Sequence, residues 1–506
     1  MASRSLALEA RGVGLTRAAS APLFRQVDLR LVPGWYGLVG ANGAGKTTLL
    51  RVLSGELAPS EGSVRIEPAG ALVALCAQEA PSLAPGLLAF AEDPGGQAAS
   101  LRGRLALDRA PLDRWTTLSP GERKRWQIGE ALWREPDVLL LDEPTNHLDD
   151  DGRELLVGAL RRFRGVGVLV SHDRALLEEL PRTTIRVHDA RVAAYPGAYR
   201  AASALWRAEA HALEEAHQIA RDRVRAVAAR LADTRREQES ADRARSAGRR
   251  MKDPRDHDAR SMGAKVVAAW AEARSGRAVG VVRAELARAE QAVPSLTKDR
   301  TLGARVFASF ERAPSPVLFH LDEAAVTAGG ATLLTDVRVT VSRDDRVRVA
   351  GANGAGKTTL VRALLATARD PGRVLYLPQE LAAGEVWALA ATLRTLDAEA
   401  RGRVLSVFAA LGSDPERIVL RHPEDAGRLS PGEARKLSLA MGLGRHAWAL
   451  VLDEPTNHLD LPSIERLEGA LGAYPGAVVL VTHDDAFAAS VTARTLRVTE
   501  GAVQMQ

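Results

Sequence analysis

The 506-residue sequence has one cysteine, Cys76, and this scarcity limits its chemistry. A single thiol cannot form a disulfide within the chain, and a cysteine-ligated metal site or iron–sulfur cluster needs several. No stretch approaches the roughly 18 consecutive apolar residues that cross a bilayer, and Met1–Ala10 lacks the apolar run of a signal peptide. We therefore expect a protein of the cytoplasm.

The composition is that of a folded globular chain. Hydrophobic residues make up 46% and charged residues 26% of the sequence, and the length suits roughly three domains of about 150 residues. The net charge of +5 is unevenly placed, because residues 201–300 hold 21 Lys and Arg against 15 Asp and Glu. A basic segment of this kind indicates a polyanionic partner.

Four motifs occur twice, and each pair is separated by 311 residues. They are Gly-Ala-Asn-Gly-Ala-Gly-Lys-Thr-Thr (40–48, 351–359), Leu-Ser-Pro-Gly-Glu (118–122, 429–433), Asp-Glu-Pro-Thr-Asn-His-Leu-Asp (142–149, 453–460) and Ser/Thr-His-Asp (171–173, 482–484). One shared offset indicates a duplicated domain and not a short-period solenoid. We expect a first copy over 1–200, a charged helical linker over 201–313 and a second copy over 314–506.

Each copy alternates predicted strands with helices, as the first copy illustrates. Gly37–Val39 is predicted to be a strand that enters a glycine-rich loop, and Thr47–Leu53 the helix that leaves it. Val138–Leu141 and Val166–Val170 are continuous apolar runs, as in strands buried on both faces of a parallel sheet. The pattern predicts an α/β fold in both copies.

Between the copies, apolar residues recur every three or four positions in two stretches, which is typical of amphipathic helices. The first set is Leu213, Ala216, Ala220, Val224, Val227 and Leu231, and the second is Val279, Val282, Leu286, Ala289 and Val293. Residues 243–265 hold eight Lys and Arg against three Asp. We expect a helical hairpin with a basic connecting region.

The first motif fits a phosphate-binding loop, the P-loop. Its glycines let the backbone N–H groups line a cradle for phosphates at a helix N-terminus. We expect Lys46 to reach the β- and γ-phosphates of ATP and the Thr47 hydroxyl to bind Mg²⁺. An ordinary glycine-rich turn is the alternative for one match, but two matches disfavour it. The predicted nucleotide-binding residues are Gly40, Asn42, Gly43, Gly45, Lys46, Thr47, Thr48, Gly351, Asn353, Gly354, Gly356, Lys357, Thr358 and Thr359.

Carboxylates follow an apolar strand in both copies. Asp142 and Asp453 end these strands and are predicted to hold Mg²⁺. Glu143 and Glu454 come next and are predicted to polarise the attacking water, against the alternative of a solvated strand cap.

Two further pairs of polar residues follow apolar runs. His172 and His483 are predicted to sense the γ-phosphate, although a structural hydrogen bond is the alternative. Gln78 and Gln379 could touch both Mg²⁺ and the water, or be exposed loop residues. Gln78 lies 32 residues after its P-loop lysine and Gln379 only 22, which predicts a shorter hairpin in the second copy.

Together these motifs resemble the ATP-binding-cassette superfamily, in which Leu-Ser-Pro-Gly-Glu is similar to the signature sequence. The resemblance implies two α/β nucleotide-binding domains that close head-to-tail within a monomer, with each ATP held between a P-loop and the opposite signature. The first P-loop would face Ser430, Gly432 and Glu433, and the second would face Ser119, Gly121 and Glu122. ATP would then join the copies and its hydrolysis would release them.

Within the superfamily, Glu-Pro-Thr-Asn-His-Leu-Asp, the tandem layout with a charged linker, and Tyr195-Pro-Gly-Ala-Tyr199 are similar to the ABC-F proteins. The stretch 249–260 resembles the basic linker tip of antibiotic-resistance members. The resemblance implies a ribosomal factor whose linker reaches large-subunit rRNA and P-site tRNA. Its RNA-binding residues would be Arg249, Arg250, Lys252, Arg255 and Arg260, unless this is only a solvated charged hairpin.

Some features depart from the family pattern. In both copies 73 residues separate the P-loop lysine from the signature serine, so we expect no arm inserted in the first copy alone. The short tail to Gln506 predicts no nucleic-acid-binding C-terminal extension. Phe24 could stack on adenine in the first copy, but Thr332–Asp336 of the second holds no aromatic residue. The two sites are therefore predicted to differ in affinity.

Two alternative functions compete with a ribosomal role. An energising subunit of a membrane transporter is disfavoured by the basic linker of roughly 100 residues and by two intact catalytic glutamates. A DNA-acting ATPase is disfavoured because the C-terminal extension and zinc-binding cysteines of such relatives are lacking. We therefore expect an ATPase whose partner is the ribosome and not DNA.

Overall fold

The structure is a computed structural model that describes residues 6–16, 22–78, 82–108, 112–146, 148, 150–250, 279–293, 307, 310–352, 354–419, 429–499 and 501–505. Asn353, Lys252, Arg255 and Arg260, all predicted site residues, lie outside this set. Arg249 and Arg250 lie on a described helix, but their side chains are also outside it. Residues 1–202 and 299–506 form one compact unit, and residues 203–298 form another.

The first copy is built on a six-stranded sheet with the order β5-β6-β7-β3-β8-β9. Its strands are β3 (Gly34–Gly40), β5 (Val73–Cys76), β6 (Val138–Asp142), β7 (Val166–Val170), β8 (Thr183–His188) and β9 (Arg191–Pro196). All neighbours pair in parallel except β8 and β9. The predicted parallel sheet is confirmed, since β6 and β7 are buried along their whole length.

The second copy repeats this sheet with the order β13-β14-β15-β12-β16-β17. Its strands are β12 (Arg346–Ala350), β13 (Val374–Leu377), β14 (Ala449–Asp453), β15 (Ala477–Val481), β16 (Arg494–Thr499) and β17 (Ala502–Met505). Because the two orders agree strand for strand, the duplication seen in the motifs extends to the topology.

Antiparallel strands accompany each sheet and were not among the sequence predictions. In the first copy, β1 (Ala7–Thr16) pairs with both β2 (Pro22–Leu31) and β4 (Glu61–Glu67). In the second copy, β10 (Val317–Ala328) pairs with β11 (Ala331–Ser342). Apolar side chains of these strands share one core with the P-loop helix and the parallel sheet of their own copy.

Helices cover the sheets and carry the signature motifs. The first copy has α1 (Lys46–Leu53), α2 (Pro85–Glu92), α3 (Gly96–Arg104), α4 (Pro120–Trp133), α5 (Asp150–Leu160) and α6 (Arg174–Glu179). The second has α9 (Lys357–Ala366), α10 (Ala383–Thr395), α11 (Ala398–Ala410), α12 (Glu416–Val419), α13 (Pro431–Gly444), α14 (Leu461–Ala473) and α15 (Asp485–Val491). Short 3-10 turns are η1 (Leu112–Thr117) and η4 (Pro371–Arg373).

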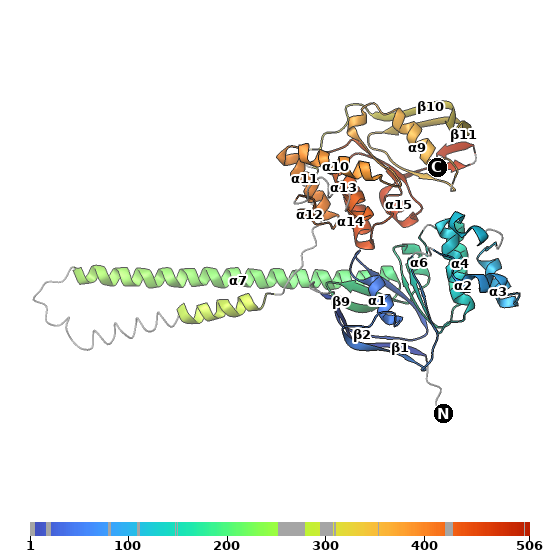
Figure 1. The fold of residues 1–506 in the computed structure, drawn as a ribbon. Helices are drawn as coiled ribbons and strands as arrows, with labels where there is room; N and C mark the ends of the chain where they lie inside the picture. Colours follow the sequence, from blue (N-terminus) through green and yellow to red (C-terminus); the bar gives the residue numbers. More distant parts are fainter. Residues whose placement is uncertain are drawn as a thin grey trace, which may run out of the picture. The chain divides into compact units, whose positions relative to one another are not determined.

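The linker contains the two predicted helices. The first is α7 (Tyr199–Arg250), and the second runs over residues 279–291 alongside it (Figure 1). Val227 and Leu231 of α7 pack against Val282 of the second helix. Arg230 Nη1 forms an ion pair with Glu285 Oε2 at 3.4 Å. Among the helices of the described residues, none combines the length and the hydrophobicity of a membrane-spanning segment.

Candidate nucleotide-binding site

The P-loops of the two copies have the same backbone conformation. Gly43 and Gly45 have φ of 79° and 98°, and Gly354 and Gly356 repeat both values. These left-handed angles suit glycine and turn successive N–H groups toward one concavity at the start of a helix. The loops can therefore cradle phosphate, as the motif predicts.

Each P-loop lysine spans its own loop. Lys46 Nζ donates to the carbonyl oxygens of Gly40 and Ala41 at 2.8 and 3.1 Å, and the side chain is 7% exposed. Lys357 Nζ donates to Gly351 at 2.7 Å. Burial lowers the pKa of Lys46, although the carboxylates of Glu143, Asp460 and Asp142 oppose that shift. The ammonium group thus stands where phosphate oxygens could replace carbonyls as its acceptors.

The residues predicted to hold Mg²⁺ meet at the end of the apolar strands. Thr358 Oγ1 donates to Asp453 Oδ2 at 3.0 Å, and the Thr47 hydroxyl bonds Asp142 in the same way. Burial raises the pKa of both aspartates, and Asp142 Oδ2 is buried without a hydrogen-bond partner. A hydroxyl beside a buried carboxylate oxygen is a donor set of the type that Mg²⁺ prefers, so the residues fit the ion.

The two predicted water-polarising glutamates share an unusual backbone. Glu143 and Glu454 have φ of 48° and 47°, in the left-handed region where non-glycine residues are uncommon. Their N–H groups donate to Val170 and Val481 on the neighbouring strand, both at 2.9 Å. Strain of roughly 1–3 kcal/mol at such a position is typical of functional sites, since the surrounding structure must hold it.

Each glutamate faces the predicted phosphate-sensing histidine. His172 Nε2 lies 3.2 Å from Glu143 Oε1, and its backbone N–H donates to Oε2 at 3.3 Å. In the second copy His483 Nε2 lies 3.6 Å from Glu454 Oε1. Burial raises the pKa of Glu143 to about 8 and lowers that of His172 to about 3. Burial therefore disfavours the charged form of both groups, and the Lys46 ammonium opposes this effect for the Glu143 carboxylate.

One predicted residue, Phe24, is placed differently from what its proposed role requires. Phe24 is fully buried in the core of the first copy, beside Gly45 and next to β1, so its ring offers no face to a base. Leu334, also fully buried, holds the equivalent place beside Gly356. Gln78 and Gln379 are exposed, and their described contacts are made by backbone carbonyls.

The signature serines cap their helices. Ser119 Oγ accepts from the Glu122 N–H at 3.2 Å, and the Ser119 backbone N–H donates to Glu122 Oε2 at 2.8 Å, which closes a capping box at the start of α4. Ser430 and Glu433 do the same for α13. Because the described bonds of Ser119 and Glu122 join them to each other, their approach to the second P-loop stays a prediction.

The first P-loop contacts the second copy within the same compact unit. The Asn42 N–H donates to Asp460 Oδ2 at 2.6 Å, and its amide nitrogen donates to His458 O at 3.3 Å. A Cβ at Gly432 would lie 2.6 Å from the same His458 oxygen and 3.9 Å from the Asn42 amide. The structure therefore brings together Asn42 and the signature glycine Gly432, two residues predicted to share an ATP.

Asp460 both accepts the hydrogen bond from Asn42 and caps a helix of the second copy. It caps α14 by accepting from Ser463 N at 2.9 Å. Burial would raise the pKa of Asp460, but the Lys436 charge and the N–H donors outweigh burial and lower it. We expect Asp460→Ala to lower the free energy of unfolding by about 2 kcal/mol, because a cap and an acceptor for Asn42 are both lost.

Urea unfolding of the variant tests this expectation against a matched cap. Asp397 caps α11 through Ala400 N at 2.8 Å and is exposed, so Asp397→Ala should cost only the about 1 kcal/mol of a cap. Equal losses for the two variants would show that the contact with Asn42 adds nothing to stability.

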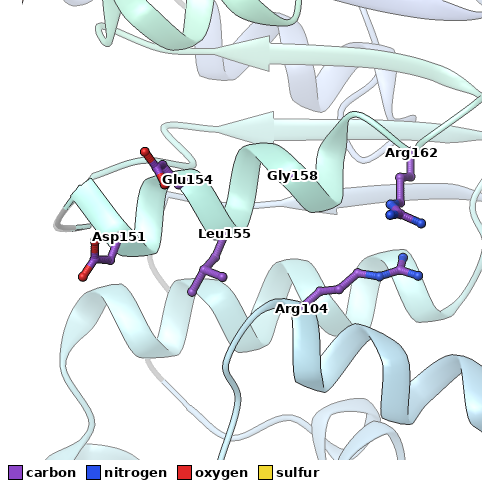
Figure 2. A pocket seen from close by; sticks show the side chains of 6 residues that line it. All are labelled: Arg104, Asp151, Glu154, Leu155, Gly158 and Arg162. Atoms are coloured by element: carbon purple, nitrogen blue, oxygen red, sulfur yellow. The ribbon is translucent and has the colours of Figure 1, made fainter.

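A hollow of about 580 Å³ lies on the first copy between α3 and α5. Figure 2 shows its lining residues, Arg104, Asp151, Glu154, Leu155, Gly158 and Arg162. Arg104 and Arg162 approach each other near one end of α5, and the two carboxylates lie toward the other end (Figure 2). The hollow shares no lining residue with the predicted nucleotide site.

Two buried cations were not among the predicted site residues. Lys124 on α4 and Arg435 on α13 donate to the backbone at the predicted magnesium and glutamine positions. The signal in the sequence was their spacing, since they follow the signature serines by five residues and are 311 residues apart.

Comparison with known proteins places these features in a context. Residues 24–146 and 334–457 match the family described as ABC transporter. The tylosin resistance ATP-binding protein TlrC of Streptomyces fradiae is 31% identical, over 94% of this chain and 95% of TlrC. The ribosome protection protein VmlR of Bacillus subtilis is 26% identical, over 96% of this chain and 85% of VmlR.

The fold has counterparts among solved structures. The structure titled RNase-L Inhibitor matches this fold with a TM-score of 0.60 at 18% sequence identity. The match covers 97% of this chain and 90% of the RNase-L Inhibitor chain. At this identity the likeness concerns the fold alone, and it extends over both copies.

Proposed function

This chain belongs to the ABC-F subfamily of ATP-binding-cassette ATPases, and we propose that it closes around two ATP molecules to act on the ribosome. The proposal has three parts: the pairing of the copies, the hydrolytic step and the target. The observation that carries the first is the contact of Asn42 in the first P-loop with Asp460, His458 and the neighbourhood of Gly432.

Further contacts near the same α14 support a head-to-tail pairing. Arg174 of α6 forms a two-pronged ion pair with Glu468, with one prong at 3.0 Å. Tyr199 Oη donates to Glu465 at 2.7 Å. In the closed state, ATP on the first P-loop meets the N-terminus of α13 at Ser430, and ATP on the second meets the N-terminus of α4 at Ser119. Helix N-termini favour the negative charge of the γ-phosphate.

Hydrolysis at each site uses the groups that converge at the end of the apolar strand. Thr47 and Asp142 would hold Mg²⁺ in the first site, and Thr358 and Asp453 would hold it in the second. When bound there, Mg²⁺ would supply positive charge to the phosphates of ATP. Glu143 takes a proton from the water that attacks the γ-phosphorus, and the bond to the ADP oxygen breaks. The backbone N–H of His172 holds this carboxylate, and the single N–H of its neutral ring donates to the phosphate.

The ribosome is the target that the relatives favour. VmlR is named a ribosome protection protein and TlrC a tylosin resistance protein, and both align over most of this chain. The basic linker supplies the charge that RNA backbones attract. We therefore propose a cytoplasmic factor that binds rRNA and tRNA through Arg249, Arg250, Lys252, Arg255 and Arg260, and that protects translation from an antibiotic.

Sedimentation of an ATP-trapped variant with purified ribosomes tests the target. The variant carries Glu143→Gln and Glu454→Gln, which should retain ATP and hold the copies closed. We expect it to pellet with ribosomes at least about tenfold more than in ADP, since closure is the ATP-dependent step. Changing the five basic residues to Gln should reduce pelleting with ribosomes. The pelleting that remains should also depend less steeply on salt concentration.

The controls separate the target from the enzyme. The same variant mixed with duplex DNA or with membrane vesicles should not gain ATP-dependent binding. ATP retention without any gain in ribosome binding would contradict the ribosomal role and leave the paired ATPase standing.

A further inference from the structure

A lysine is buried beneath the first signature helix. Lys124 of α4 is 4% exposed, and its Nζ donates to Ala77 O at 2.6 Å, Asp142 O at 2.9 Å and Gln78 O at 3.3 Å. These carbonyls lie at or just beyond the carboxyl ends of the adjacent parallel strands β5 and β6. An ammonium group has three N–H donors, so all of them are used on backbone oxygens.

An arginine does the same in the second copy. Arg435 of α13 is 2% exposed and donates to Gln379 O at 2.7 Å, Asp453 O at 3.1 Å and Glu454 O at 2.6 Å. The two copies thus use different side chains at the same position to hold equivalent carbonyls. What they share is a buried cation tied to the backbone of the predicted glutamine and aspartate of one ATP site.

Burying a cation among carbonyl oxygens has an unfavourable desolvation free energy. Burial lowers the pKa of Lys124, and also that of Arg435, which shows that their surroundings disfavour the charge. Apolar side chains of similar volume would avoid this cost, but they would leave several strand-end carbonyls without donors. The arrangement therefore fixes backbone that an apolar contact would leave free to move.

The helix that carries Lys124 also carries a residue of the other ATP site. Ser119 caps α4 and, in the proposed pairing, faces the γ-phosphate on the second P-loop. Ser119 and Lys124 are five residues apart, about 7 Å along one rigid helix. Ser430 and Arg435 have the same relation on α13.

We propose that Lys124 and Arg435 are positioning residues that couple the two ATP sites. Each sits on a signature helix that binds ATP in one site, and each holds the backbone of the residues that carry out hydrolysis in the other site. The inference rests on the proposed head-to-tail pairing. When ATP on the second P-loop draws Ser119, α4 moves and Lys124 moves the segments that bear Gln78 and Asp142. Arg435 acts in the reverse direction on Gln379, Asp453 and Glu454.

Rapid-quench measurement of the first turnover with saturating ATP and Mg²⁺ tests the coupling. In the Glu454→Gln background, only the first site hydrolyses, so the burst reports that site. Misplacement by about 1 Å can cost a hundredfold in rate. We expect Lys124→Met to lower the burst rate constant by about ten- to a hundredfold, with the Kd for ATP changed less than about threefold.

Three further variants separate positioning from folding. Lys124→Arg installs the residue that the second copy uses, and we expect it to restore the burst to within about threefold. Arg134→Met removes an exposed cation at the end of the same helix, paired with Glu130 at 3.6 Å, and should leave the burst unchanged. Should Lys124→Met not fold, Lys124→Gln, which loses the charge but keeps two donors, takes its place and should give an intermediate rate.

The outcomes distinguish the coupling from the proposed function. A burst of one ATP per chain in Glu454→Gln, unaffected by Lys124→Met and Lys124→Gln, would overturn the coupling and leave the pairing intact. A parallel loss of burst rate, ATP affinity and melting temperature would also overturn it, because that pattern reports a structural role only. Absence of any burst in the Glu454→Gln parent would instead contradict the two-site function itself.

Discussion

Replacing Glu143 by Gln should lower hydrolysis at the first site by about a thousandfold while ATP still binds, because a positioned general base contributes 10²- to 10⁴-fold. The carboxyl group lies 3.2 Å from His172 at the end of β6 and next to Asp142, and its strained backbone aims it into the site. An amide has the same shape but cannot accept a proton from water. Single-turnover hydrolysis and retention of labelled ATP measure the two effects separately.

The companion variants define what this result would mean. Glu454→Gln should have the same effect on the second site, and the double variant should release phosphate about a thousandfold more slowly than the parent. Glu130→Gln is the control, since Glu130 is a half-buried carboxyl on α4 whose pKa is raised by burial but which the mechanism does not use. Unchanged hydrolysis in Glu143→Gln would show that another group activates the water.

Replacing Gly40 by Ala should destabilise the first copy by about 3 kcal/mol and abolish its ATP binding, since overpacking of this kind typically costs 1–3 kcal/mol or more. A Cβ at Gly40 would overlap the carbonyl oxygen of Val187 on β8, and one at Gly351 would overlap Val498 on β16. The obstacle is backbone in the middle of a sheet, which cannot rotate away as a side chain would. Strand and P-loop must therefore separate.

Thermal unfolding and ATP titration of Gly40→Ala check both effects. Gly103→Ala is a suitable control because Gly103 lies in α3 with no atom within 4 Å of an added Cβ. That change should stabilise the chain by roughly 0.5–1 kcal/mol, as alanine does in helices. A Gly40→Ala protein that melts and binds ATP as the parent does would contradict the close packing of the P-loop against β8.

The chemistry-bearing motifs could be predicted from the sequence because each is contiguous. A P-loop carries its glycines, lysine and threonine within nine residues. The tight turn, the phosphate-binding N–H groups and the lysine ammonium are therefore all specified by one short stretch of the chain. Apolar runs such as Val138–Leu141 identify buried parallel strands for the same reason. The shared offset of 311 residues then supplied the duplicated fold without any contact information.

Features that depend on partners distant in the chain could not be predicted in this way. The antiparallel strand β4 pairs with β1, about 50 residues earlier, and nothing local to either specifies that register. Phe24 looks like an exposed aromatic upstream of the P-loop, but the pairing of β1 with β2 turns it into the core. The absence of an aromatic in the second copy is matched by Leu334, which packs in the same place.

By itself the sequence predicted which residue types line the two ATP sites, and it determined that the motifs occur twice and that a basic segment lies between them. Only the tertiary structure decided which charges are buried. Lys124 stands between Arg123 and Arg125, a run that a sequence alone presents as a solvated face. The packing of α4 against the ends of β5 and β6 turns Lys124 inward, where carbonyl oxygens at the strand ends accept its N–H bonds, because burial is a property of packing and not of neighbouring residues.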